Sequence, residues 1–128
     1  KEISAFVSGA GTGGTIMGVS KRLKLVCPEA RTVLVMPAEP AECHGIQGIN
    51  DGADFLVDRS QVTDRIEITT PEATERAKRI AREHGLLVGI SSGANVLAAE
   101  RWIEENDPAG VVVTMLCDRG ERYLSIFD

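Results

Sequence analysis

Short apolar runs alternate along this chain with stretches of helical periodicity. Residues 3–7 form the first run, and residues 31–36 form a second run that stops at Pro37. Both runs are mostly apolar without strict alternation, which is typical of strands buried on both faces of a parallel sheet. The stretch between them predicts a helix that ends near Cys27, because apolar side chains recur on one of its faces. The members of this face are Ile16, Val19, Leu23 and Val26.

A loop and a second type of strand follow in the middle of the chain. Residues 39–54 contain three glycines and predict a loop with a short helical turn. Residues 62–68 alternate apolar and polar side chains. This alternation predicts a strand with one face in water.

The next helix has clear signals at both ends. Thr70 offers a hydroxyl N-cap, Pro71 suits the first helical position, and Glu72 places an acid in the first turn. Gly85 is suited to end the helix. We expect its buried stripe to consist of Ala73, Ala77, Ile80 and Ala81. We expect its solvated face to carry Arg76, Lys78, Arg79 and Arg82.

Two further strands are expected at residues 86–90 and 111–116, with a helix containing Trp102 between them. Residues 111–116 are nearly all β-branched, so we expect this strand at the centre of the sheet. Strands that alternate with helices favour right-handed crossovers and a parallel sheet. The predicted fold class is therefore α/β, with a three-layer, open, mostly parallel sheet flanked by helices in one domain.

A glycine-rich segment, residues 8–15, joins the first strand to the first helix. Glycines allow positive φ angles and close approach of a ligand, and the helix N-terminus attracts an anion. Thr12 and Thr15 add hydroxyl donors, which suit a phosphate monoester better than a bridging pyrophosphate. A nucleotide-binding P-loop is excluded, because Thr15 is followed by Ile16 and no Lys-Ser/Thr pair is present. A glycine-rich turn without a ligand is the other interpretation.

The same segment also satisfies a dinucleotide-binding pattern. Gly9, Gly11 and Gly14 have the spacing G-x-G-x-x-G, and Glu39 follows the second strand, where a ribose-binding acid is expected. A dinucleotide-binding Rossmann module is therefore an alternative hypothesis.

The composition is that of an ordinary globular domain. The chain has 128 residues, of which 43% are apolar and 26% charged, enough for one domain with a core. Its net charge is −5 and its basic residues are scattered among acids, so we expect no nucleic-acid or membrane partner. The apolar runs are too short to cross a membrane, and no targeting leader is visible. We expect a cytoplasmic protein.

The cysteines give no sign of a metal site or of a disulfide framework. Cys27, Cys43 and Cys117 are odd in number, widely spaced and without a C-x-x-C pair. The Cys43-His44 pair is interpreted as part of a loop. Reduced thiols and no bound metal are expected.

Two other loops should meet the glycine loop at one edge of the sheet, because the carboxyl ends of parallel strands lie together. Ser91 follows the strand predicted at residues 86–90, where it can aim a neutral hydroxyl at a ligand. Ser92 has the simpler interpretation of an N-cap. Cys117 and Asp118 follow the last strand, where a charged turn without function is the other interpretation.

The three loops, in this order, resemble those of the cysteine synthases, also called O-acetylserine sulfhydrylases. These are pyridoxal-phosphate enzymes of the tryptophan-synthase β-chain fold group, or fold-type II. The likeness runs from Ala5 through Ser125, and the Cys-Asp-Arg-Gly sequence after the last strand is more similar to the B isoform than to the A isoform. The segments that carry it are residues 11–15, 39–40, 46–49, 89–94 and 117–125.

This resemblance implies pyridoxal 5′-phosphate as cofactor, held by residues of the chain's three loops. Ser91 would bind the pyridine nitrogen, Cys117 would lie near the ring, and Gly48 would line the substrate pocket. The residues assigned to the cofactor phosphate are Gly11, Thr12, Gly13, Gly14 and Thr15.

The resemblance also implies a reaction and an assembly. Family members replace the acetate of O-acetylserine, or the phosphate of O-phosphoserine, with sulfide to give L-cysteine. Cystathionine β-synthase and serine or threonine dehydratase share these loops and remain alternatives. The family implies a homodimer acting on small molecules. A domain that has lost catalysis and binds a partner is a further hypothesis.

The chain departs from the family in the residue that begins the chemistry. The Schiff-base lysine of these enzymes lies upstream of the matching segments, so we expect residues 1–128 to be the C-terminal part of a longer enzyme, inactive by itself. No catalytic residue is assigned to this chain. The segment of residues 39–46 is also shorter than the corresponding segment of A-type members, so the resemblance does not identify the substrate. We expect none of the chain's lysines to reach a ligand on the glycine loop. They are Lys1, Lys21, Lys24 and Lys78.

Overall fold

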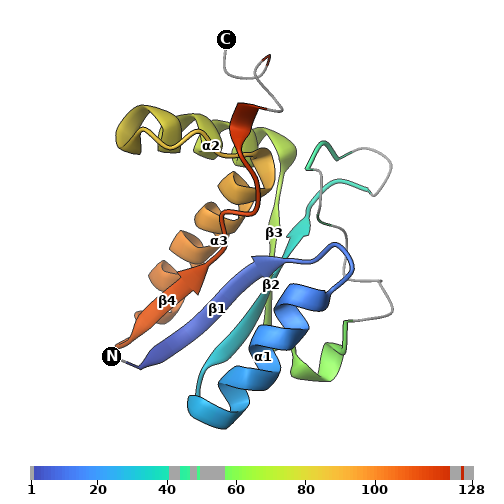
Figure 1. The fold of residues 1–128 in the computed structure, drawn as a ribbon, viewed down its shortest axis with the longest axis vertical. Helices are drawn as coiled ribbons and strands as arrows, with labels where there is room; N and C mark the ends of the chain where they lie inside the picture. The colour runs from blue at the N-terminus through green and yellow to red at the C-terminus, as the bar shows by residue number, and fades with distance from the viewer. Residues whose placement is uncertain (1, 41–43, 47–48, 50–56, 122–124, 126–128) are drawn as a thin grey trace.

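The computed structural model describes residues 2–40, 44–46, 49, 57–121 and 125 (Figure 1). The strands are β1 (Ile3–Gly9), β2 (Arg31–Pro37), β3 (Asp64–Ile68) and β4 (Val111–Thr114). The helices are α1 (Gly14–Val26), the 3-10 turn η1 (Arg59–Gln61), α2 (Thr70–His84) and α3 (Ile90–Asn106). In the part of the chain described, no helix is long and apolar enough to span a membrane.

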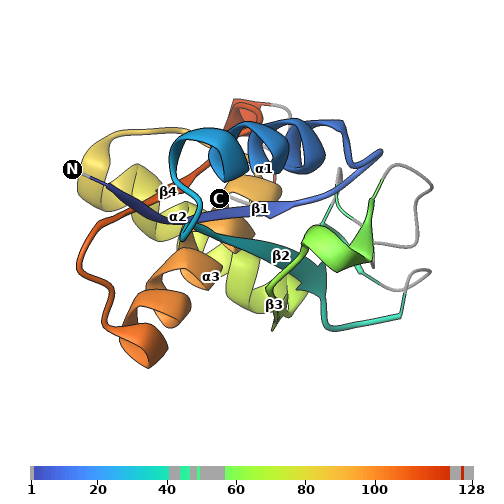
Figure 2. The ribbon, with the colours of Figure 1, turned by 90° about the horizontal axis from the view of Figure 1, so that it is seen from below.

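The strands form one parallel, four-stranded sheet in the order β3-β2-β1-β4. Val7 of β1 pairs with Val33 of β2 on one side and with Thr114 of β4 on the other. Helix α1 covers one face of the sheet, while α3 covers the opposite face and α2 packs against α3 (Figure 2). These layers confirm the predicted α/β class and the three-layer arrangement.

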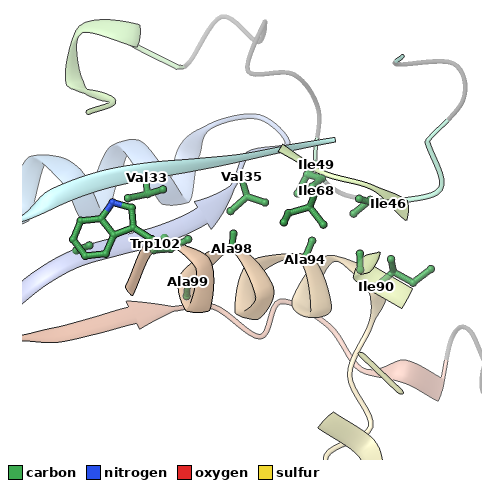
Figure 3. Packing of buried hydrophobic residues seen from close by; sticks show 13 residues of the cluster. Val33, Val35, Ile46, Ile49, Ile68, Ile90, Ala94, Ala98, Ala99 and Trp102 are labelled. Carbon is green, nitrogen blue, oxygen red and sulfur yellow. The ribbon is translucent and has the colours of Figure 1, made fainter. Parts of the chain in front are cut away.

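Two apolar cores hold the layers together, one on each face of the sheet. On the α3 face, side chains of β2 and β3 meet the alanines of α3 and Trp102, as Figure 3 shows. Trp102 is 4% exposed, and its Nε1 donates to Asp64 Oδ2 at 3.0 Å. On the α1 face, Ile16 and Leu23 pack with Phe6. Val26, expected on the buried face of α1, is instead exposed at the end of the helix.

The strand predicted at residues 86–90 is wrong. Helix α3 begins at Ile90, and Val88 makes only an isolated antiparallel bridge with Arg119. Gly89 N donates to Asp118 O at 3.2 Å, and Gly120 N donates to Leu87 O at 2.9 Å. The apolar run therefore finds its backbone partners in the segment after β4 and not in the sheet.

The central position predicted for the last strand is also wrong within the described sheet. Strand β4 has one neighbour, β1, and Val111 is 40% exposed. The pattern was misleading because β-branched side chains favour any pleated strand and do not report its place in the sheet.

The N-cap of helix α2 lies one residue earlier than predicted. The N-cap is Thr69, whose hydroxyl accepts from Glu72 N at 3.2 Å, while Glu72 Oε2 accepts from Thr69 N at 2.9 Å. This reciprocal pair is a capping box. The predicted end is confirmed, since Gly85 closes the helix with φ 68°.

Arg76 was expected on the solvated face of α2 and is instead 9% exposed. Its Nε lies 2.6 Å from Glu100 Oε1 on α3. The helical pattern could not predict this position, because the ion pair forms across two helices and lets a long side chain be buried between them.

We expect Glu72→Gln to destabilise the protein by about 1 kcal/mol at neutral pH, after allowance for solvent screening. Hydrogen bonds from Arg101, then from Thr69, lower the pKa of Glu72 from 4.5 to about 2. A lowered pKa contributes stability above pH 4.5 that is lost as the pH falls towards 2. Denaturant unfolding at pH 7 and pH 2.5 should therefore show a clearly larger difference at the higher pH.

The matched control for this prediction is Glu75→Gln. Glu75 pairs with Arg82 across the same helix, but both side chains are 61% exposed. Its loss should change stability by less than about 0.5 kcal/mol. Equal effects of the two variants at pH 7 would contradict the role given to Glu72.

Candidate functional site

A cavity of about 270 Å³ lies at the carboxyl end of β1, beside the start of α1. Its wall combines the glycine loop with two residues that follow β4. The lining residues are Ser8, Gly9, Ala10, Gly11, Thr12, Gly13, Gly14, Thr15, Ile16, Met115 and Cys117. The ligand edge expected from a parallel sheet is therefore hollowed at the predicted loop.

The glycine loop presents the start of α1 to this cavity. Gly13 is the N-cap of α1 and has φ 95°, a conformation that favours glycine. No side chain caps the helix, and its first turn contains no acid. Gly14 N donates to Thr12 Oγ1 at 3.4 Å, so the hydroxyl also faces the helix start. Backbone donors, a helix dipole and hydroxyls together favour an anion.

Cys117 forms the opposite wall, with Ser91 behind it. The Ser91 hydroxyl hydrogen-bonds to the Cys117 thiol, and Ser91 is 4% exposed. Cys117 is an exposed residue, but partial desolvation of its thiol, reinforced by the charge of Asp118, raises its pKa, although hydrogen bonds with Ser91 and Asn95 act in the opposite direction. The thiol is therefore neutral at physiological pH and not a nucleophilic thiolate.

The first turns of α3 hold the cavity walls in place. Asn95 is fully buried, and its Oδ1 accepts from Gly9 N at 2.9 Å. Its Nδ2 donates to Met115 O at 3.0 Å and lies 3.5 Å from Cys117 Sγ. Ser92 Oγ accepts from Cys117 N at 3.1 Å. Sequence reasoning assigned no role to Asn95. The one signal was the presence of an amide side chain directly before an apolar stretch of the expected helix.

The structure brings most of the predicted site residues together. Ser91 does not line the cavity and is not at the end of a strand, but lies in the first turn of α3 beside Cys117. Ser92 is not an N-cap, since Gly89 has that position. Gly48 and Cys43 lie outside the described residues. The predicted residues found in the cavity wall are Gly11, Thr12, Gly13, Gly14, Thr15 and Cys117.

Glu39, the acid of the dinucleotide alternative, has another partner. Its Oε1 accepts from Thr70 N at the start of α2. Burial alone would raise the pKa of Glu39, but its hydrogen bonds with Thr70 outweigh burial and lower it. Glu39 therefore acts as an anion at the α2 N-terminus and is not in the wall of the glycine-loop cavity.

None of the described lysines lines the cavity. Lys21 and Lys24 are exposed on α1, and Lys78 lies on α2. Within the described residues, no cluster of three or more histidines, cysteines or acids is arranged for a metal ion. The cavity has donors for an anion, but these lysines supply it with no amine.

Residues 1–118 match the family described as "Pyridoxal-phosphate dependent enzyme". The chain belongs to this family. Pyridoxal phosphate is therefore the cofactor of the family to which this chain belongs.

Named members of the pyridoxal-phosphate family are similar over nearly the whole chain. O-ureido-L-serine synthase of Streptomyces lavendulae is 38% identical over 99% of the chain, and cysteine synthase of Staphylococcus aureus (strain Mu50) is 40% identical over 98%. A solved O-acetyl serine sulfhydrylase isoform 3 from Entamoeba histolytica superposes with a TM-score of 0.89, 33% identity and 97% coverage. The chain spans only 42%, 43% and 40% of these three proteins.

The residues present fit the phosphate group of the family's cofactor. The uncapped start of α1 offers backbone N–H donors, the first turn has no acid to repel an anion, and Thr12 adds a hydroxyl. The neutral Cys117 thiol and Met115 give the opposite wall a less polar surface suited to a ring. The donor set therefore matches a molecule with a phosphate at one end and an aromatic ring at the other.

Proposed function

We propose that the protein containing this chain is a cysteine synthase-like enzyme that replaces the β-substituent of an activated serine with sulfide. O-acetylserine and O-phosphoserine are the substrates proposed. The observation that carries the proposal is the joint cavity of the glycine loop and the Cys117 segment in a chain of the pyridoxal-phosphate family. The cysteine synthase and the sulfhydrylase among its relatives support this choice of reaction.

In this proposal the glycine loop binds and orients the cofactor. Gly13, Gly14 and Thr15 place N–H and hydroxyl donors at the start of α1, where the helix dipole stabilises a phosphate. Pyridoxal phosphate, when bound, supplies the electron sink for cleavage of bonds to the amino-acid substrate. The protein's part is to fix the position of the ring and to exclude competing reactions.

Ser91 is proposed as the partner of the pyridine nitrogen. A serine hydroxyl has one donor and two acceptor sites. The Ser91 O–H, which donates towards the Cys117 sulfur, can turn instead to donate to an unprotonated ring nitrogen. A neutral hydroxyl does not enforce a charged pyridine, which favours prompt loss of a β-leaving group.

The covalent step requires a lysine that the described part of this chain does not bring to the cavity. We therefore propose that residues 1–128 are catalytically inactive alone and act with other parts of a longer enzyme. A cytoplasmic homodimer acting on small molecules remains the predicted setting. The nucleophile that replaces the β-substituent is not decided by these relatives, because one of them is an O-ureido-L-serine synthase. Cystathionine β-synthase and dehydratase activities remain alternatives.

A comparison of cofactors tests the proposal. Added pyridoxal phosphate at 100 times its Kd should stabilise the protein by about 2.7 kcal/mol, whereas NAD should have no effect. The measurement is thermal unfolding with each compound, accompanied by the absorption spectrum of the bound cofactor. Stabilisation by NAD and not by pyridoxal phosphate would instead support the dinucleotide-binding alternative.

A further inference from the structure

Asn95 connects the two walls of the cavity through one side chain. It lies in α3, yet its hydrogen-bond partners belong to the end of β1 and to the segment after β4. Gly9, Met115 and Cys117 all line the cavity. Asn95 itself is fully buried and is not part of the lining.

The chemistry of the partners fixes the orientation of the Asn95 amide. Gly9 N–H is a donor and needs Oδ1, whereas Met115 C=O is an acceptor and needs the Nδ2 hydrogens. A rotated amide would oppose donor to donor and acceptor to acceptor. The side chain therefore links the walls in one arrangement only, and each wall's position depends on the other.

The two walls have different tasks in the proposed function. Gly9 leads into the loop that faces a phosphate, while Cys117 stands with Ser91 where the ring is expected. Pyridoxal phosphate must contact both walls at once. Inorganic phosphate needs only the glycine loop.

We propose that Asn95 is a positioning residue that couples the phosphate-binding loop to the Cys117 wall, so that an anion bound at one wall orders the other. This inference rests on the proposed function for the identity of the ring-bearing ligand. The coupling itself does not depend on the proposed function, and inorganic phosphate can reveal it.

Hydrogen exchange of the apo-protein, without any substitution, tests the coupling directly. Inorganic phosphate should slow exchange of the Cys117 amide, whose hydrogen-bond partner is Ser92 Oγ on α3 and not an atom of the glycine loop. Coupling between sites is reciprocal, so a ligand at one wall must stabilise the ordered form of the other. No change at Cys117 on phosphate binding would overturn the proposal.

Asn95→Leu removes all three contacts at similar volume, and Asn95→Ala serves if the larger side chain does not fit. The matched control is Thr32→Val, which removes the buried hydrogen bond from Thr32 Oγ1 to Ser20 Oγ, at 3.1 Å and away from the cavity lining. Asn95 variants should weaken pyridoxal phosphate about tenfold, and inorganic phosphate less. They should also abolish the phosphate effect on Cys117 exchange, which the control retains.

The outcomes separate a structural role from a positioning role. If the Asn95 and Thr32 variants lose stability alike and bind pyridoxal phosphate as the wild type does, Asn95 only stabilises the fold and the proposal is wrong. If the Asn95 variants do not fold, the wild-type exchange measurement decides. A wild-type protein that binds pyridoxal phosphate no better than inorganic phosphate refutes the proposed function, while the exchange result still judges the coupling.

Discussion

Gly14→Asp is expected to weaken pyridoxal phosphate binding by roughly 30- to 1000-fold while leaving the fold intact. The new carboxylate would stand in the first turn of α1, facing the cavity. Repulsion between a carboxylate and a nearby phosphate is on the order of 2–4 kcal/mol near a protein surface. A Cβ at Gly14 meets only Thr12 Oγ1, at 3.7 Å, so the backbone can accept the side chain.

The same substitution should stabilise the unliganded protein. An acid in the first turn of a helix adds about 0.3–1 kcal/mol through the helix dipole, and α1 has none at present. The variant should thus gain stability and lose cofactor affinity. A substitution that merely unfolds the loop would lower both. Denaturant unfolding and cofactor titration of the same sample measure both.

Gly14→Asn is the matched control for this charge effect. It has nearly the same shape without the charge, so it should weaken pyridoxal phosphate binding far less. Equal affinities of the aspartate variant and the wild type would show that the phosphate does not bind at the start of α1. The assignment of Gly11 through Thr15 to the cofactor phosphate would then be wrong.

Gly93→Ala is expected to lower the free energy of unfolding by about 3 kcal/mol, the upper part of the range for overpacked sites. A Cβ at Gly93 would lie 2.2 Å from Ala73 O and 2.8 Å from Ala77 N, both backbone atoms of α2. Backbone atoms cannot turn away as a flexible side chain can. The two helices would have to separate where α3 also supports the cavity.

Gly18→Ala provides the control, because it places the same methyl group in a helix without a clash. Apart from its chain neighbours and the backbone of its own helix, no described atom lies within 4 Å of a Cβ at Gly18, so the substitution should stabilise α1 by about 0.5–1 kcal/mol. Thermal or denaturant unfolding of both variants makes the comparison. A Gly93 variant as stable as the wild type would contradict the close packing of α2 on α3.

The sequence allowed prediction of the features that depend on neighbours along the chain. The glycine loop between β1 and α1 was located because strand, glycines and helical period follow one another within residues 3–26. The end of α2 was predicted correctly because the left-handed φ angle that ends the helix depends only on the presence of glycine at position 85. Local propensity and hydrophobic period carried these predictions.

What could not be predicted depends on contacts between distant residues. The run at residues 86–90 has strand composition, but Leu87 and Gly89 find their partners after β4. Asn95 Oδ1 accepts from Gly9, which is 86 positions away along the chain. Ser91 was named because it follows an apolar run, and its role was implied by a family resemblance, whereas its position beside Cys117 emerged only from the packing of α3 against the last segment.

The position of β1 between β2 and β4 also has a consequence for synthesis of the chain. The first strand of this unit needs the last strand of the same unit as its neighbour, since Ile3 pairs with Val111 and Val7 with Thr114. While a ribosome is still adding α3, one edge of β1 has no partner within this unit, and the glycine-loop cavity lacks its second wall. Contacts of such long sequence separation form slowly. The cavity at the carboxyl end of β1 can therefore be complete only after translation has passed Cys117.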